Sequence, residues 1–157
     1  MNLLKWVALL AVGLPLGVIV AGQLGWLAGR APGDLGVRDG RLKAPSPTPN
    51  SVSSQADLWP GHPQQAYARI APLAAPLARV QQAAAQLPGA RVVAHRADYV
   101  HIEYTTRWLR FVDDAEFWAD PAQPGVVQLR SASRLGRKDF GVNRARIEAL
   151  RARLAAG

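Results

Sequence analysis

The sequence predicts an α+β fold: a two-layer domain with an antiparallel sheet of about four strands and two helices, preceded by one N-terminal transmembrane helix. Three patterns lead to this prediction. The chain opens with a long apolar run in which Lys5 is the one charged residue before Arg30. Between residues 90 and 133 apolar side chains alternate with a period of two. On either side of that stretch they recur every three or four residues.

The apolar run from Trp6 to Leu27 contains no charged residue. Its length suits a helix that crosses a hydrocarbon core of roughly 30 Å. A cleaved signal peptide would have a shorter run that ends in small residues at both cleavage positions. Ile19-Val20-Ala21 supplies only one of these two residues, and the run continues past it. We therefore expect residues 1–29 to be an uncleaved membrane anchor.

Small residues recur at every fourth position of this run, at Gly13, Gly17, Ala21 and Gly25. On a continuous helix they form a ridge that a second membrane helix can approach closely, and Pro15 beside it is a site for a kink. The alternative is that glycine and alanine are simply frequent in membrane helices. The ridge is therefore consistent with a partner helix and also with the ordinary composition of a membrane helix.

The charges around the anchor bear on its orientation. Lys5 and the amino terminus lie on one side, whereas Arg30, Arg38, Arg41 and Lys43 follow the apolar run on the other. The positive-inside rule alone would keep the domain in the cytoplasm, although long domains are translocated despite such charges.

Residues 30–62 are rich in glycine, proline and serine and show neither helical nor strand periodicity. The prolines of Ala44-Pro-Ser-Pro-Thr-Pro-Asn50 favour an extended backbone without internal hydrogen bonds. We expect residues 30–62 to be a tether that leads, through a turn at Pro49-Asn50-Ser51, into a short extended stretch. Residues 63–157 are expected to form the α+β domain.

Two helices are predicted near the ends of this domain. Pro76 and Pro88 bound the first helix, which is expected over residues 76–87. The last helix is expected over residues 143–154, with Asn143 as its N-cap. Both show apolar residues spaced by three and four, namely Leu77, Val80, Ala84 and Leu87 in the first and Ile147, Leu150 and Leu154 in the last.

The strands are predicted between the two helices, where the apolar period is two. Short polar turns, or turns with proline and glycine, separate them, so neighbouring strands are expected to pair antiparallel. The predicted strands are Ala90–Ala94, Tyr99–Thr105, Leu109–Trp118 and Val126–Ser133.

Three carboxylates interrupt the third of these strands, at Asp113, Asp114 and Glu116. Asp113 shares one face of the strand with Phe111 and Phe117, whereas Asp114 and Glu116 share the other face. A carboxylate among phenylalanine side chains needs a partner, because burial of an unpaired charge is costly.

Arg130, on the following strand, is the cation expected across the hairpin. If Ala119 pairs with Val126, Arg130 lies on the face of Asp113. A shift of the register by one residue brings Arg130 to Asp114 and Glu116 instead. Both registers place a carboxylate beside Arg130, and the sequence leaves the choice open.

The residues after this strand are mostly polar and lead to the start of the last helix. Free backbone N–H groups and the helix dipole favour an anion at such a position. We therefore expect a ligand-binding or structural polar cluster that comprises Asp113, Asp114, Glu116, Arg130, Ser131, Ser133, Arg134, Asp139, Asn143 and Arg144.

The composition narrows the function classes. The chain has no cysteine and three scattered histidines, so we expect no thiol catalysis, no zinc site, no cofactor and no assigned catalytic residue. The formal net charge of +8 favours anionic partners, such as anionic lipid or an anionic polymer. A nucleic-acid partner is not expected, because interleaved aromatic residues and a known binding module are missing.

Several blocks of the sequence occur in a characteristic order: Phe111-Val-Asp-Asp-Ala-Glu-Phe117, Leu129-Arg-Ser-Ala-Ser-Arg134, and Asp139-Phe-Gly-Val-Asn143 with Arg146-Ile-Glu-Ala-Leu150. They resemble the signature blocks of the bacterial family of domain of unknown function 1499 (DUF1499). Gly33-Asp-Leu-Gly-Val-Arg38 and Pro49-Asn-Ser-Val-Ser-Ser54 resemble the segment that leads into that domain, so the resemblance spans residues 33–154. It implies no activity, because none is known to us for the family.

The resemblance has one departure and one further implication. Members of the family commonly carry a cysteine at the positions that match Ser46 and Ser51, and this chain has serine at both. A role that requires those thiols is not carried over. Members usually begin with a membrane helix or a signal sequence, which favours the bacterial inner membrane and a domain on its periplasmic side.

Two functions are consistent with these observations. The first is a membrane-anchored, non-catalytic envelope module that binds an anionic ligand or acts as an accessory subunit of a membrane protein complex. The alternative is a carboxylate- or metal-dependent hydrolase that uses Asp113, Asp114 or Glu116, together with Asp139. The alternative is weakened because Asp113 and Asp114 point to opposite faces and no histidine accompanies them.

Overall fold

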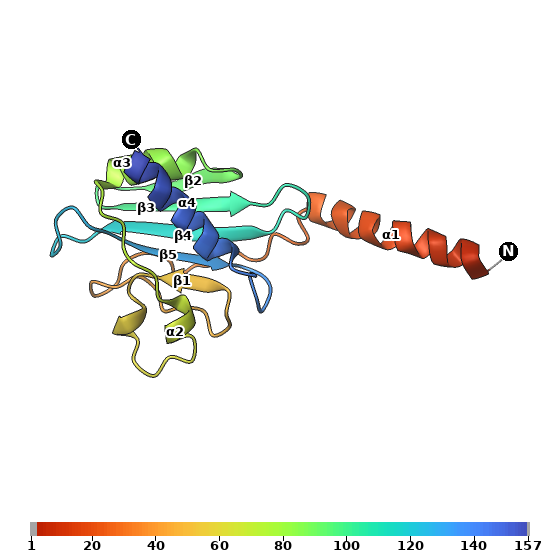
Figure 1. Cartoon of the computed structure of the whole chain (residues 1–157), viewed down its shortest axis with the longest axis horizontal. Coiled ribbons are helices and arrows are strands. Elements are labelled where there is room, and N and C mark those ends of the chain that lie inside the picture. Colours follow the sequence, from red (N-terminus) through yellow and green to blue (C-terminus); the bar gives the residue numbers. More distant parts are fainter. Residues whose placement is uncertain (1–2, 157) are drawn as a thin grey trace.

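The computed structural model describes residues 3–156 of the chain. A long apolar helix, α1 (Leu3–Gln23), projects from an α+β body, as Figure 1 shows. The body contains one sheet, with the α3 and α4 helices on one of its faces. The predicted fold class is therefore confirmed: an antiparallel α+β domain that follows an apolar N-terminal helix.

The sheet has five antiparallel strands in the order β1-β5-β4-β3-β2. Four of them match the predicted strands, and the fifth, β1, lies in the predicted tether. β1 pairs with β5 through only three residues, so it was too short to show a period of two. The bounds are β1 Ser51–Ser53, β2 Ala90–His95, β3 Tyr99–Thr105, β4 Val112–Ala119 and β5 Val127–Ser133.

The helices α3 (Leu77–Ala85) and α4 (Val142–Ala156) pack on one face of this sheet. A short helix, α2 (Gln65–Ala68), and a 3-10 turn (Ala56–Leu58) precede them. Alternate strand residues and one face of each helix form the core, and burial of each such side chain stabilises the fold by about 1.5–3 kcal/mol. The core includes Val52, Ile70, Leu73, Val80, Val100, Ile102, Phe117, Leu129, Ile147 and Leu150.

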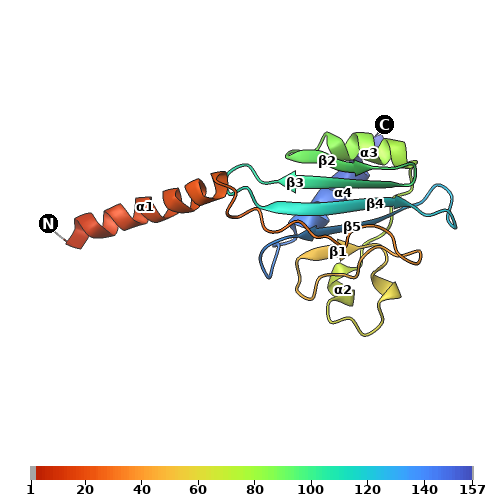
Figure 2. The same cartoon turned by 180° about the vertical axis from the view of Figure 1, so that it is seen from behind.

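The opposite face of the sheet is covered by residues 29–50, which we call the strap. It runs from the end of α1 along the sheet and returns, and Figure 2 shows it crossing that face. Leu42 is buried to 1% exposure and packs with Tyr99 and Trp118. The division of the chain at residues 29 and 62 stays a prediction, but much of the predicted tether packs in the same body as the domain.

The register of the β4–β5 hairpin settles which alternative holds. Ala119 pairs with Val127, and Glu116 lies opposite Arg130. The chain therefore adopts the shifted register of the two that the sequence allowed. β4 begins at Val112 and not at Leu109, because residues 107–109 form a turn.

α1 is the one helix among the described residues that is long and apolar enough to cross a membrane; its span, Lys5–Gln23, has a mean hydropathy of 1.9. Nothing lies within 4 Å of a Cβ built on Gly13 or Gly17. Gly25 has a φ of 82° and follows the last helical residue, so the predicted ridge on α1 ends at Ala21.

The end of α1 contacts the β3–β4 loop. The Gln23 side chain donates a hydrogen bond to the carbonyl of Trp108 at 2.9 Å. A Cβ added to Gly22 would lie 2.5 Å from the carbonyl oxygen of Leu109, so only glycine permits this approach. The helix and the body are thus joined by direct contacts as well as by the chain.

Candidate functional site

The predicted polar cluster is divided between the two faces of the sheet. Asp114, Glu116 and Arg130 lie under the strap, because even-numbered residues of β4 and β5 face away from the helices. Asp113 and Ser131 face α4 instead. The structure therefore does not bring the predicted residues into one site.

Asp114 lies at the centre of a buried ion-pair network under the strap. Its carboxylate accepts hydrogen bonds from Nε of Arg134 at 2.8 Å and from Nη2 at 2.7 Å. Nε2 of His101 lies 2.8 Å from Oδ1 of Asp114. Glu103 accepts a hydrogen bond from Nη2 of Arg134 at 2.5 Å and also pairs with Arg91.

These contacts fix the ionisation of the two carboxylates. Burial alone would raise the pKa of Asp114, but hydrogen bonds from Arg134 and His101 bring that pKa below its ordinary value. The same balance, with Arg134 and Arg91 opposing burial, lowers the pKa of Glu103. A lowered pKa keeps a carboxyl group ionised near neutral pH, which disfavours a role of Asp114 or Glu103 as a general acid.

Glu116 joins the strap to the sheet and is fully buried. Its Oε1 accepts hydrogen bonds from the backbone N–H of Gly36 at 2.6 Å and from the hydroxyl of Tyr99 at 2.8 Å. Oε2 has no hydrogen-bond partner among the described residues and lies 3.8 Å from Nη1 of Arg130. Nε of Arg130 donates to the carbonyl of Ala44 at 3.0 Å. Arg130 thus pairs with Glu116, and both contact the strap.

Asp113 has a partner that the hairpin argument did not consider. Nη2 of Arg146, on α4, lies 2.6 Å from Oδ2 of Asp113. The same guanidinium lies 4.4 Å from the centre of the Tyr104 ring, and its Nη1 donates to Oδ1 of Asn143 at 2.9 Å. Arg146 was not among the predicted partners, because only residues of neighbouring strands were considered. Its position about one helical turn after Asn143, on the same side of α4, was the signal available in the sequence.

Asp139, and not Asn143, caps the last helix. Oδ2 of Asp139 accepts the N–H of Asn143 at 3.1 Å, and Oδ1 accepts the N–H of Gly141 at 3.0 Å. The prediction of Asn143 as the N-cap is therefore wrong, because α4 begins at Val142 and Asp139, which precedes the helix, reaches forward to its first turn.

Asn143 is instead a buried bridge between α4, the sheet and the strap. Its Oδ1 accepts from the hydroxyl of Ser131 at 2.5 Å. Its amide donates to Oγ of Ser133 at 3.0 Å and to the carbonyl of Asn50 at 3.3 Å. These contacts give Asn143, Ser131 and Ser133 a structural role in the described fold.

The anion position predicted at the start of α4 is filled by the chain itself. The Asp139 carboxylate occupies it and also accepts a hydrogen bond from the hydroxyl of Tyr67 at 2.7 Å. Burial would raise the pKa of Asp139, but hydrogen bonds from Tyr67, from the N–H of Gly141 and from Asn143 lower that pKa below its usual range. Nη2 of Arg144 donates to the carbonyl of Tyr67 at 2.5 Å.

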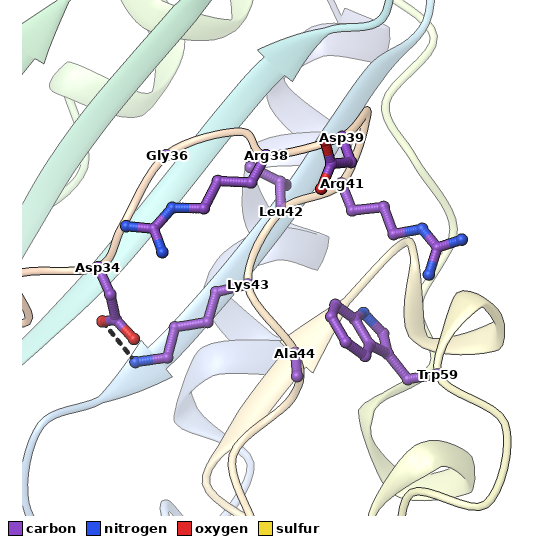
Figure 3. Close-up of a pocket in the computed structure, with 9 residues that line it drawn as sticks. All are labelled: Asp34, Gly36, Arg38, Asp39, Arg41, Leu42, Lys43, Ala44 and Trp59. Atoms are coloured by element: carbon purple, nitrogen blue, oxygen red, sulfur yellow. Dashed lines mark hydrogen bonds and ion pairs between the residues drawn. The ribbon is translucent and has the colours of Figure 1, made fainter.

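A basic hollow of about 530 Å³ lies at the turn of the strap. Its charged lining residues are Asp34, Arg38, Asp39, Arg41 and Lys43. In Figure 3, Lys43 points to Asp34, and the two side chains form an ion pair with Nζ 2.6 Å from Oδ1. Arg38 and Arg41 extend in opposite directions from the turn.

Trp59 forms the aromatic wall of the basic hollow. The Arg41 guanidinium lies 5.9 Å from the centre of its ring. The indole Nε1 is buried and has no hydrogen-bond partner among the described residues. From the sequence, Arg38, Arg41 and Lys43 bear only on membrane orientation. Their proximity to Trp59 depends on the path of the strap, which no sequence pattern predicts.

The carboxylates do not assemble into a metal centre. Within residues 3–156, no group of three or more histidine, aspartate or glutamate side chains is arranged to hold a metal ion. Asp113, Asp114 and Glu103 each pair with arginine, which competes with a cation for their oxygen atoms.

These features define a class of protein: a small α+β domain whose sheet is covered by helices on one face and by a strap on the other, and which follows an apolar helix. The chain belongs to the family described as Protein of unknown function (DUF1499), whose model matches residues 41–154. The match begins a few residues after the resemblance seen from residue 33. No curated protein and no solved structure matches the chain.

Proposed function

We propose that the chain is a membrane-anchored, non-catalytic module of the bacterial envelope that binds an anionic group in the basic hollow. The hollow carries this proposal, because it combines Arg38, Arg41 and Lys43 with an aromatic wall at Trp59. Lys43 is paired with Asp34, whereas Arg38 has no ion-pair partner among the described residues. Arginine binds carboxylate and phosphate groups with two parallel hydrogen bonds.

The partners of the buried carboxylates disfavour the hydrolase alternative. Asp113, Asp114 and Glu116 pair with arginine side chains, and Asp113 and Asp114 lie on opposite faces of the sheet. Asp139 instead accepts the N–H groups at the start of α4. The strap covers the face that holds Asp114 and Glu116. A substrate would have to displace the strap to reach them.

Binding by the full chain in detergent micelles tests the proposal. Inorganic pyrophosphate is a suitable probe, because it carries several negative charges and no apolar group. Calorimetry is expected to show saturable binding that weakens by about tenfold in Arg38→Gln, since a hydrogen bond to a charged group contributes roughly 1.5–3 kcal/mol. Arg153→Gln, at the end of α4, is the matched control. Absence of saturable binding, or equal weakening in both variants, contradicts the proposal.

An accessory role in a membrane complex is a second candidate. It is supported by Gly13 and Gly17, which have open space around them on the exposed surface of α1. Close packing of a partner helix on this surface would be blocked by Gly17→Leu. Loss of a co-purifying membrane protein from Gly17→Leu, with Val18→Leu as control, is the expected result.

We also propose that α1 lies in the inner membrane with the domain on its periplasmic side. The chain has no native cysteine, so Gln123→Cys in the exposed β4–β5 turn reports the location of the domain. A thiol reagent that does not cross membranes is expected to label this variant in intact cells. Labelling only after the inner membrane is opened would place the domain in the cytoplasm.

A further inference from the structure

Two loops at the end of the domain next to α1 carry exposed aromatic and cationic side chains. These proximal loops are residues 106–111, between β3 and β4, and residues 134–141, between β5 and α4. Figures 1 and 2 both show them at the end of the sheet from which α1 projects. They adjoin each other, because the backbone N–H of Arg134 donates to the carbonyl of Val112 at 3.1 Å.

The proximal loops expose large apolar side chains. Phe140 is 93% exposed and Trp108 is 62% exposed. Phe140 also has a φ of 52°, in the left-handed region that bulky residues rarely occupy. Leu135 and Phe111 line an apolar hollow beside Phe140. An aromatic residue held outward in an unfavourable conformation indicates that this surface meets something other than water.

Cations surround these apolar side chains. Arg107, Arg110, Arg137 and Lys138 are exposed, and none of them forms an ion pair with a carboxylate in the part of the chain that the structure describes. The Arg107 guanidinium lies 4.9 Å from the centre of the Trp108 ring. Tryptophan with neighbouring arginine and lysine is the composition found at the boundary between lipid and water.

The contact between the proximal loops and the end of α1 indicates that these loops face the membrane. Gln23, the last residue of the apolar helix, is hydrogen-bonded to the carbonyl of Trp108, and Gly22 packs against Leu109. The point where the helix leaves the hydrocarbon is therefore also the point where the proximal loops begin. This continuity favours the lipid surface over a soluble partner.

We propose that the proximal loops dock on an anionic lipid surface, with Trp108 and Phe140 at the level of the headgroups and the four cations against lipid phosphates. The proposal rests on the membrane anchoring of α1 in the proposed function. Docking would fix the domain upright on the membrane and present the basic hollow at its far end, where Leu42 packs on Trp118.

Spin labels on the full chain in liposomes that contain anionic lipid test this docking. Because the chain has no native cysteine, Phe140→Cys, Leu14→Cys and Gln123→Cys each give one label site. The label at 140 is expected to be more accessible to oxygen than to a water-soluble nickel complex. The label at 14, within the span, should show the same preference more strongly, and the label at 123 should show the opposite preference.

The outcomes separate the two proposals. A lipid-exposed label at 14 with a water-exposed label at 140 overturns the docking and leaves the anchor intact. A water-exposed label at 14 overturns the anchor and the docking together. In the docked case, Lys138→Gln should lower the ratio of docked to undocked domain by about fivefold, since one cation near an anionic surface contributes roughly 1 kcal/mol. If this ratio changes neither with Lys138→Gln nor with the content of anionic lipid, the proposed binding of the loops to lipid phosphates is wrong.

Discussion

Arginine side chains compensate the charge of the buried carboxylates in this sheet. Arg134 serves Asp114 and Glu103 on one face, and Arg146 serves Asp113 on the other. A buried ion pair costs desolvation energy, so it stabilises a fold weakly but becomes costly when one partner is lost. The planar guanidinium suits this role because it donates several hydrogen bonds in one plane.

Asp113 should therefore be coupled to Arg146 and not to Arg130. Removing either partner of the Asp113–Arg146 pair should destabilise the domain by about 3–5 kcal/mol, because the other charge stays buried. The measurement is urea denaturation of the alanine variants of Asp113, Arg146 and Arg130, and of the double variants that combine Asp113→Ala with each arginine variant. The cycle with Arg146 should show coupling of about 0.5–3 kcal/mol, whereas the cycle with Arg130 should be additive within about 0.5 kcal/mol. Coupling to Arg130 alone would contradict this assignment.

Stability should fall in acid because of the same carboxylates. The pKa values of Asp114, Glu103 and Asp139 are lower in the folded chain than in an unfolded one, where they are about 4. Their contribution is fully present well above pH 4 and is lost as the pH falls through the lower, folded pKa values. Urea denaturation of the full chain in micelles between pH 7 and pH 2.5 measures this loss.

Asp114→Asn should reduce the steepness of this acid dependence, since one of the depressed groups is removed. Asp98→Asn, in the exposed β2–β3 turn, is the matched control and should leave the dependence unchanged. An acid profile that is the same in Asp114→Asn as in the unchanged chain would argue against the ion-pair network as its cause.

At the scale of elements, the strap covers the second face of the sheet and buries side chains on it. It is held by backbone and side-chain contacts: Glu116 accepts from Gly36, and Gln55 Oε1 accepts from the N–H of Leu42 at 2.8 Å. Leu42 supplies its main apolar contact with Tyr99 and Trp118. An irregular segment with this composition is thus part of the fold.

Leu42→Ala should destabilise the domain by about 2–5 kcal/mol, because it opens a cavity between the strap and the sheet. The loss should be measured by urea denaturation with tryptophan fluorescence. Leu58→Ala is a suitable control, since Leu58 is 42% exposed and should cost far less. Equal small losses in the two variants would mean that the strap adds little to stability.

Periodicity explains which elements the sequence could predict. β2 to β5, α3 and α4 repeat apolar residues at the period of their own structure, so their existence was predictable and their bounds differed by a few residues. The strap and β1 have no period, and their position depends on contacts with residues far along the chain. The same holds for the site: pairing of Arg130 followed from the hairpin, whereas Arg146 and Trp59 come from elements whose placement requires the tertiary fold.

At the scale of the whole molecule, α1 continues from one end of the sheet and contacts it. Figures 1 and 2 show a helix that projects away from the body, joined at the β3–β4 loop. Gly22 permits this junction, since any side chain there would meet the backbone of Leu109. The tilt of the domain is therefore tied to the direction of the helix.

Gly22→Leu should separate α1 from the β3–β4 loop and leave the domain folded. Spin labels at Val18→Cys and Gln123→Cys in liposomes should give a broader distance distribution in Gly22→Leu. Gly17→Leu is the matched control, because a side chain at Gly17 meets nothing within 4 Å. An unchanged distribution in Gly22→Leu would show that the junction does not set the tilt.

A hydrogen bond also ties the strap to the first residue of β1. The backbone N–H of Ser46 donates to Oγ of Ser51 at 2.8 Å, at the two positions where members of the family commonly carry cysteine. A hydrogen bond of this kind forms without an oxidant and survives a reductant. Formation of this link therefore requires neither a thiol oxidase nor a disulfide isomerase, and the link is insensitive to the glutathione potential of the compartment in which the chain folds.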